Sequence, residues 1–207
     1  MKRMILSFCL VLLTSFCVEM QAQSLKSILS SSTVKDAITA VTGGKSVTAA
    51  NLVGTWTYAN PAVALEGDNA LKNITGSVAS KEVEKKIQTY CEKIGLKEGG
   101  LTYTFNSDST FSCIFKGKTV NGTYSLDQTA KTITLKFGKV GKKSSLNSFT
   151  GHVLLSSDKL DLLFNVDKLF SLLNKLSTLT NNSTLKLANS MASQYESIKV
   201  GLELKKQ

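Results

Sequence analysis

The chain has 207 residues, a formal net charge of +10 and a hydrophobic content of 42%. Arg3 is its single arginine, so the positive charge is nearly all lysine, which lacks the planar fork that reads phosphates and guanine edges bidentately. Beyond residue 22 the chain has one histidine and two cysteines, too few to favour a protein-built zinc site. These counts argue against sequence-specific nucleic-acid binding and a metal centre, and the length suits one domain with a sizeable core.

Residues 1–22 have the pattern of a signal peptide. Lys2 and Arg3 form a short basic region, Met4–Val18 is an apolar run, and Ala22 supplies the small residue at the cleavage position. We therefore expect the protein to be exported, to the periplasm or beyond the cell.

The same leader bears on membrane attachment. The apolar run is shorter than the roughly 20 residues of a membrane span, and no second such segment follows, which predicts no stable membrane insertion. Cys17 follows bulky Phe16, whereas a lipid-attachment site has a small residue there. This disfavours a lipoprotein and favours ordinary cleavage after Ala22.

Between the leader and Gly100 the sequence predicts two helices with a strand and an irregular stretch between them. Residues 24–42 have apolar side chains at three- and four-residue spacings, within an N-terminal segment of residues 23–44. Residues 52–58 follow as a first strand, and 59–77 read as irregular because they contain Pro61 and several turn residues. A helix is predicted over 81–94, with Gly95 at its end.

From Gly100 onward the apolar period changes from 3.6 to 2. The alternation predicts strands at 101–105, 111–115, 120–126, 133–137, 149–155 and 160–164, and short turns between them indicate an antiparallel meander. Residues 166–179 and 187–195 return to helical spacing, before a last strand at 198–204. The first of these helices could lie on a membrane, but its place between two strands favours packing against the sheet.

Counting the strand at Trp56, these segments give eight strands with one apolar face each. Eight strands suit a closed barrel whose interior holds side chains or one small ligand, and closure removes exposed edges. The sequence thus predicts a mainly β fold: an eight-stranded antiparallel barrel over residues 45–207, with helical insertions after the first strand and before the last, plus an N-terminal helix.

The chain resembles a lipocalin-like (calycin-type) domain family of uncharacterised exported proteins from Gram-negative gut bacteria. The resemblance covers roughly residues 45–206. It is carried by the following positions: Gly54-x-Trp56-x-Tyr58, Pro61, Val63, Glu66-Gly67-Asp68-Asn69, Leu71, Gly76, Tyr90 to Gly95, Thr102-Tyr103-Thr104-Phe105 and Gly122-Thr123-Tyr124. It implies a barrel fold, and no functional residues, since the family has no established activity.

The chain also departs from animal lipocalins in two respects. It has helices between its first two strands and before its last one. It lacks an arginine near the end to pack over Trp56, which puts the usual closed end of the barrel in question. Gly54 and Trp56 are predicted to be structural, with Trp56 plugging one end of the barrel and Gly54 permitting close backbone approach.

The two cysteines allow two interpretations. Export would permit a disulfide between Cys91 and Cys113. Both lie on apolar faces, one of a helix and one of a strand, which slightly favours two buried free thiols.

Groups for catalysis are scarce. His152 is the sole histidine and falls out of phase with the apolar face of its strand, so we expect it to point to solvent. Glu66 and Asp68 stand beside glycine and asparagine, where turn formation explains them. Haem or another coordinated cofactor would depend on His152 or Met191 as a ligand, and neither position favours that role. The sequence predicts no enzyme, no catalytic residues and no cofactor.

Aromatic side chains on one side of the predicted sheet are the candidates for ligand contact. Their simplest interpretation is a filled core, and the alternative is that part of them lines a cavity for an apolar or amphipathic ligand, with tyrosine hydroxyls orienting it. The candidates are Tyr58, Tyr103, Phe105, Phe111, Phe115, Tyr124 and Phe137.

The preferred hypothesis is an exported, non-enzymatic lipocalin-like protein that binds a small hydrophobic molecule in its barrel. The alternative is a cell-envelope interaction module with a filled core, whose outer face or helical insert binds a protein or a glycan. A carboxylate-dependent hydrolase is a third class, and it would require two carboxylates that converge in one pocket.

Overall fold

The computed structural model describes residues 46–66, 71–78, 80–140, 143–145, 148–178 and 198–207. The chain divides into two compact units, residues 1–40 and 41–207, and every described residue belongs to the second. The predicted signal peptide and the helices predicted at 24–42 and 187–195 lie outside the described residues, as does Asp68. All predicted strands fall within the second unit.

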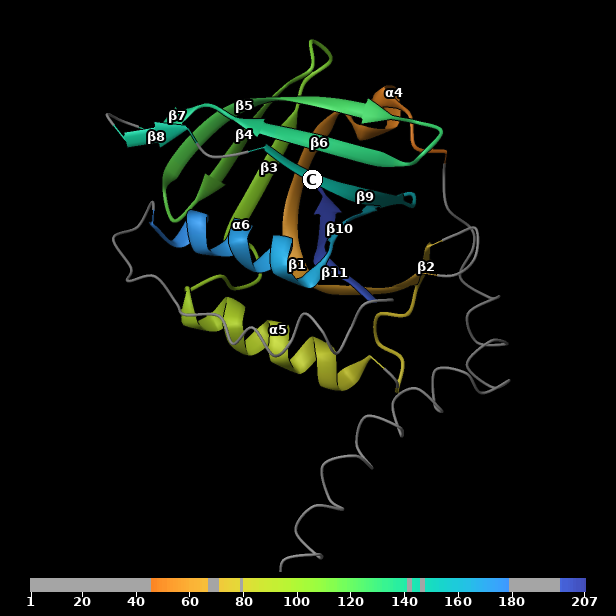
Figure 1. Cartoon of the computed structure of the whole chain (residues 1–207). Helices are drawn as coiled ribbons and strands as arrows, with labels where there is room; N and C mark the ends of the chain where they lie inside the picture. The colour runs from red at the N-terminus through yellow and green to blue at the C-terminus, as the bar shows by residue number, and fades with distance from the viewer. Residues whose placement is uncertain (1–45, 67–70, 79, 141–142, 146–147, 179–197) are drawn as a thin grey trace, which may run out of the picture. The chain divides into compact units, whose positions relative to one another are not determined.

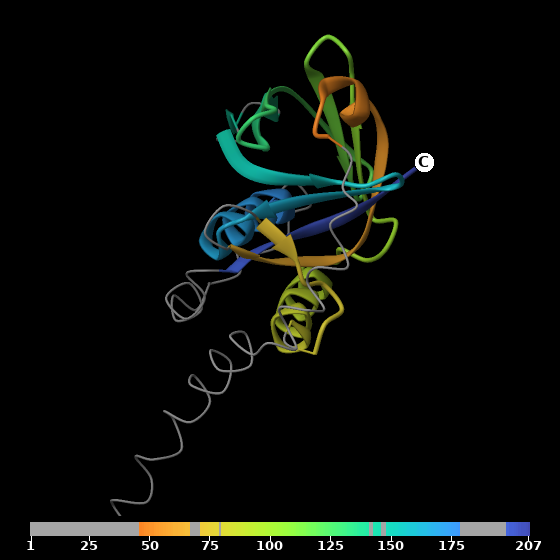
Figure 2. The same ribbon diagram turned by 90° about the vertical axis from the view of Figure 1, so that its right-hand side faces the viewer.

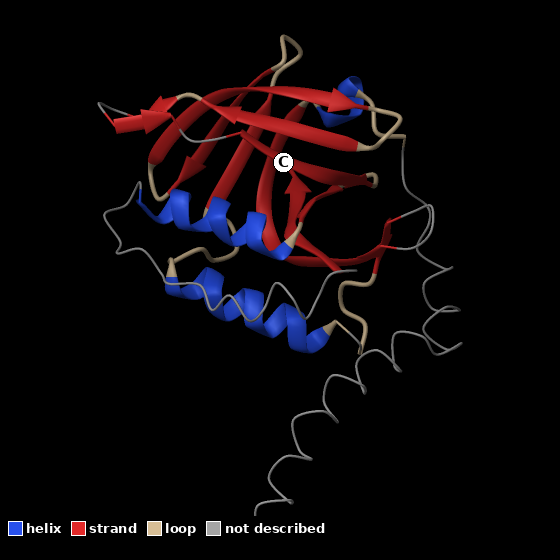
Figure 3. Ribbon diagram, viewed as in Figure 1, coloured by secondary structure: helices blue, strands red, loops and turns tan. Residues whose placement is uncertain are grey.

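The strands form an antiparallel sheet that closes into a ring (Figures 1 and 3). Nine strands take part, in the order β11-β10-β9-β6-β5-β4-β3-β1-β2, and β11 also pairs with β1, which closes the ring. β7 and β8 form a separate two-stranded ribbon. The strands of the ring sheet are β1 (Gly54–Glu66), β2 (Leu71–Asn73), β3 (Leu101–Phe105), β4 (Thr110–Phe115), β5 (Lys118–Asp127), β6 (Thr132–Phe137), β9 (Ser148–Leu155), β10 (Lys159–Phe164) and β11 (Ile198–Lys206).

Each of the eight predicted strands has a counterpart, and three short strands were missed. These are β2, β7 (Lys139–Val140) and β8 (Lys143–Ser145), with two or three residues each. So few residues cannot show an alternation, which needs at least four. The prediction of eight strands is therefore corrected to a sheet of nine.

The inner face of the ring is apolar, as the period of two predicted. In β3, Leu101, Tyr103 and Phe105 are buried while the threonines between them are partly exposed. Their partners across the ladder are Phe115, Cys113 and Phe111 of β4, which share the face and are buried too. Burying a side chain of this size stabilises the fold by about 1.5–3 kcal/mol, so this face holds the ring together.

β1 is longer than predicted, because Pro61 does not end it. The expected irregular stretch from Ala59 begins instead with a bulge: Tyr58 pairs with Leu204 and Asn60 with Glu203, leaving Ala59 as the extra residue. Beyond the bulge β1 continues to Glu66 beside β11. A proline is tolerated next to a bulge, where the ladder is already interrupted.

The other edge of β1 changes partner along its length. It pairs with β3 up to Thr57 and with β2 from Ala64. Between them, Gly99 N–H donates to Tyr58 O at 2.9 Å, and Ile74 N–H donates to Val63 O at 2.9 Å. Loop backbone thus satisfies β1 where no strand lies beside it.

Two helices pack against the sheet side by side (Figures 1 and 2). In α5 (Lys81–Lys93) the buried face carries Val83, Ile87 and Cys91. The helix ends as predicted at Gly95, whose φ of 74° lets Gly95 N–H reach Glu92 O at 2.8 Å and Leu96 N–H reach Cys91 O at 2.8 Å.

The second helix, α6 (Val166–Thr178), packs against the sheet, as predicted for the helix at 166–179. Its apolar side chains are buried, and it contacts β10 and β11. It also meets α5, because the Tyr90 hydroxyl donates to Asn174 Oδ1 at 2.9 Å and the rings of Tyr90 and Phe170 meet edge-on. The buried residues of α6 include Leu169, Phe170, Leu172, Leu173 and Leu176. No helix in the described part of the chain is both long and apolar enough to span a membrane.

Candidate functional site

The aromatic residues singled out from the sequence are brought together on the inner face of the ring. Phe105 meets Tyr124 edge-on at 5.2 Å between ring centroids, and Phe111 meets Phe137 edge-on at 5.1 Å. Phe137 in turn contacts Phe149, which the sequence analysis did not include. All seven candidates are buried: Tyr58, Tyr103, Phe105, Phe111, Phe115, Tyr124 and Phe137.

Glycines on the same face make room for these rings. A Cβ on Gly122 would lie 2.6 Å from the Phe111 ring, and one on Gly151 would lie 2.6 Å from the Phe164 ring. Both glycines occur in strands whose apolar and polar residues otherwise alternate. A glycine within such a strand indicates that another group packs closely against it. This part of the ring is a tightly packed aromatic cluster.

Trp56 lies where β1, β3 and β11 meet. Its indole Nε1 donates to Leu52 O at 2.8 Å, in the short helix α4 (Ala49–Leu52) that precedes β1. Lys206 lies opposite Trp56 in the ladder, with its Nζ 5.2 Å from the ring centroid. Gly54 has a φ of 134°, which favours glycine, and a Cβ there would meet the Lys206 side chain at 3.3 Å.

This arrangement answers the question raised by the missing arginine. A lysine from the last strand covers Trp56 instead, through its alkyl stem and its charge. Lys206 was not predicted, because the residue expected over Trp56 was an arginine. α4 and α5 lie at opposite ends of β1 (Figures 1 and 2).

We expect Lys206→Ala to expose Trp56 and lower stability by about 0.5–1 kcal/mol, the usual worth of a cation–π contact at an exposed site. Trp56 is the only tryptophan, so a red shift of its fluorescence reports the change directly. Lys206→Arg should behave as the parent protein does, and the exposed neighbour Lys205→Ala serves as control. An unshifted spectrum in Lys206→Ala would contradict the contact.

Two tyrosine hydroxyls inside the ring have no hydrogen-bond partner among the described residues. They belong to Tyr58 and Tyr103, whose side chains are 1% and 0% exposed. The hydroxyl of Tyr124, by contrast, donates to Asn106 O at 2.8 Å. Desolvation raises the pKa values of Tyr58 and Tyr103 well above their usual range, so both remain neutral donors.

Each of these hydroxyls has a cysteine thiol as its polar neighbour. Tyr58 interacts with Cys91 of α5, and Tyr103 with Cys113 of β4, although neither hydroxyl has a hydrogen bond of regular geometry. Both cysteines are buried and free in the structure. Burial raises the pKa of Cys91 to about 11 and that of Cys113 to about 12, so both thiols stay protonated.

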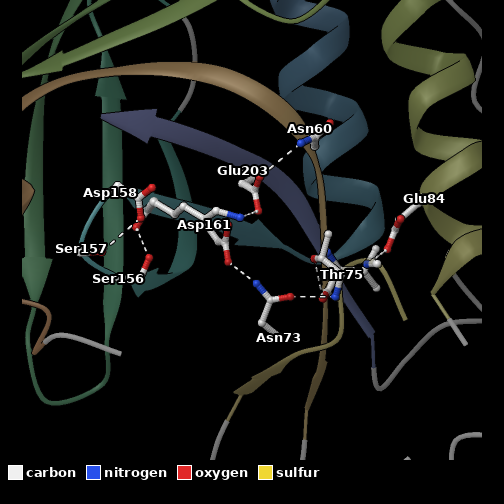
Figure 4. A network of polar contacts seen from close by, with 12 residues as sticks. Asn60, Asn73, Thr75, Glu84, Ser156, Ser157, Asp158, Asp161 and Glu203 are labelled. Carbon is white, nitrogen blue, oxygen red and sulfur yellow. Dashed lines mark hydrogen bonds and ion pairs between the residues drawn. The ribbon is translucent and has the colours of Figure 1, made fainter. Parts of the chain in front are cut away.

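The outer face of β10, β11 and β1 carries a polar network that the sequence analysis missed (Figure 4). Asp161 and Glu203 are directly opposite each other in the β10–β11 ladder, and both are nearly buried. Asn73 Nδ2 donates to Asp161 Oδ2 at 2.5 Å, whereas Asp161 Oδ1 has no hydrogen-bond partner in the described part of the chain. Lys159 Nζ lies 3.2 Å from Glu203 Oε2, and Asn60 Nδ2 donates to Glu203 Oε1 at 3.3 Å.

The setting of Asp161 changes its protonation. Desolvation, and then the charge of Glu203, raise the pKa of Asp161 to about 7. Glu203 has Lys159 as an ion-pair partner. The network can therefore hold a proton on Asp161 near neutral pH. These residues were not predicted as a group, because they are far apart in the sequence and the sequence does not reveal the strand register that brings them together.

His152 lies beside a second ion pair on the same face. Lys199 Nζ is 2.7 Å from Glu66 Oε2. Desolvation and the charge of Lys199 lower the pKa of His152, while Glu66 opposes this shift. His152 is half-buried, so the prediction that it faces open solvent holds only in part. In the described residues no cluster of three or more His, Cys, Asp or Glu could hold a metal ion.

Comparisons with known proteins assign the chain to a family. Residues 25–206 match the family model described as "Lipocalin-like domain (DUF4923)". A crystal structure of a DUF4847 family protein from Bacteroides vulgatus is similar at 14% identity, with a TM-score of 0.35, over 76% of this chain and 96% of that one. The search of curated proteins found no match. Because the family model spans most of its length, the chain belongs to the lipocalin-like domain family DUF4923.

Proposed function

We propose that the protein is an exported, non-enzymatic carrier whose ring is a lipocalin-type barrel of eight strands, with β2 attached outside, and whose interior takes up one small apolar or amphipathic molecule. The observation that carries the proposal is the pair of unpartnered hydroxyls, Tyr58 and Tyr103, within an apolar interior. A buried donor left unpaired costs about 1–3 kcal/mol. A ligand acceptor would remove that cost, as polar groups in apolar binding sites commonly do.

The described surface gives less support to a macromolecular partner. Its exposed large hydrophobic side chains are Val78 and Ile114, on different parts of the chain. The leucines of α6, which could have formed a docking face, are buried against the ring. Interaction sites are marked by contiguous apolar patches rather than by single side chains.

The outer carboxyl pair does not favour an enzyme over a carrier. Hydrolysis by two carboxyls needs both to reach a substrate. Asp161 is 5% exposed and Glu203 is 6% exposed, and their described partners are the protein's own amides and Lys159. The pair is better suited to holding strands and loops together.

Native mass spectrometry of the full chain purified from its own host tests the proposal. We expect a fraction of the protein to carry a discrete extra mass of a few hundred daltons, which organic solvent releases and mass spectrometry can identify. A protein purified without added mass, and unable to take up any apolar probe offered to it, would show that the ring interior is only a packed core.

A further inference from the structure

The chemistry inside the ring restricts what kind of molecule the proposed carrier would hold, an inference that rests on the proposed function. The inference rests on the polar groups that face inward and on the charges near them. Among the described residues, the buried charged side chains Asp161, Lys199 and Glu203 all face outward, because they alternate with apolar residues of the inner face.

The unpartnered inner polar groups are hydrogen-bond donors. Tyr58 and Tyr103 lie on adjacent strands: Tyr103 pairs with Trp56, two residues before Tyr58, so the two tyrosines are diagonal neighbours on one face. Their polar neighbours, the thiols of Cys91 and Cys113, are protonated, and sulfur is a weak acceptor. An oxygen acceptor of a ligand would be a better partner for either hydroxyl.

The same environment disfavours a charged ligand. Desolvation raises the tyrosine pKa values because this interior penalises negative charge, and a carboxylate placed there would meet the same penalty. Three described lysines lie over aromatic rings of the inner face. Lys206 lies over Trp56 at 5.2 Å, Lys116 over Phe115 at 5.5 Å and Lys175 over Phe149 at 5.8 Å.

We propose that the ligand is an uncharged, largely apolar molecule bearing an oxygen acceptor, such as a ketone, ester or ether, which accepts hydrogen bonds from Tyr58 and Tyr103. This chemistry disfavours ionised fatty acids, and plain hydrocarbons would bind without a hydrogen bond to the tyrosines.

A matched series of probes tests the proposal: a long-chain methyl ester, the alkane of the same length and the corresponding carboxylic acid, each titrated into the full chain at pH 8. Trp56, the ladder partner of Tyr103, reports binding by fluorescence, and native mass spectrometry gives the stoichiometry. We expect the ester to bind more tightly than both the alkane and the acid.

Tyr103→Phe assigns the preference to the hydroxyl. It should lower the ester-to-alkane affinity ratio about 2- to 10-fold, the value of a net hydrogen bond of 0.5–1.5 kcal/mol. Because the lost hydroxyl has no partner, its removal should not lower the melting temperature. Tyr124→Phe is the control, since that hydroxyl is already bonded to Asn106 and the ratio should stay unchanged.

The outcomes separate the two proposals. Tighter binding of the acid, or an ester-to-alkane ratio that Tyr103→Phe leaves unchanged, would overturn the ligand class while the carrier function stands. If the protein binds none of the probes and carries no mass from its host, the carrier function fails and the ligand class with it.

Discussion

Replacing Asp161 by asparagine should stabilise the protein at pH 8 and flatten the pH dependence of its stability. Asp161 faces Glu203 across the β10–β11 ladder, and its Oδ1 has no hydrogen-bond partner. A proton on Oδ1 neutralises Asp161, which removes the repulsion between the two carboxyls. It also converts Oδ1 from an acceptor without a partner into a hydrogen-bond donor. An asparagine amide reproduces that neutral, donating state at every pH.

The sign of the effect follows from the direction of the pKa shift. The folded protein holds the Asp161 proton up to a pKa of about 7, whereas the usual pKa of an aspartic acid is 3.8. Its contribution to stability is therefore complete below about pH 4 and is lost as the pH rises through 7. The loss is on the order of a few kcal/mol, since each unit of pKa corresponds to about 1.4 kcal/mol.

Urea unfolding at pH 4.5 and pH 8 measures this difference. The free energy of unfolding of Asp161→Asn should differ much less between the two pH values than that of the parent protein. Asp167→Asn, a substitution at an exposed carboxyl of α6, should show the same pH dependence of stability as the parent protein. Glu203→Gln provides an independent check: it removes the second-largest cause of the shift, so NMR titration should find the Asp161 pKa closer to its usual value. An Asp161 that titrates near 4 in the parent protein would refute the interpretation.

The strands and the aromatic face were predictable because both depend on local patterns. The period of two in β3 to β6 specifies which side chains share a face, and burial of that face selects the sheet. The course of β1 was not predictable in the same way. Pro61 and the residues after it signal a loop, but the bulge at Ala59 and the edge bonds from Ile74 and Gly99 come from distant parts of the chain.

The candidate site was predictable only in its apolar part. Nothing local in the sequence distinguishes Tyr103, whose hydroxyl is unpartnered, from Tyr124, whose hydroxyl meets a backbone carbonyl 18 residues earlier in the chain. The outer polar network was unpredictable for the same reason. Strand register places Asp161 opposite Glu203, and Asn73 reaches Asp161 from a strand of three residues. Tertiary placement, rather than residue type, creates these groups.

Gly201 shows how closely the closing strand must approach its neighbour. It lies in β11, between Leu163 of β10 and Ala62 of β1, and faces the outer side with small residues around it. A Cβ at this position would lie 1.8 Å from Leu162 O, a backbone atom that no side-chain rotation can move. Alanine there would force β10 and β11 apart at the seam that completes the ring.

Gly201→Ala should therefore destabilise the protein by about 3 kcal/mol or more, the upper part of the range for overpacking, and it should broaden or abolish cooperative unfolding. Urea unfolding and hydrogen exchange of the β10 and β11 amides measure the effect. Gly117→Ala is the matched control, since a Cβ there has open space and only the φ of 73° is unfavourable, which costs about 1 kcal/mol. Equal stability of the two variants would mean that β10 and β11 do not approach so closely, and that the ring is closed by a different register.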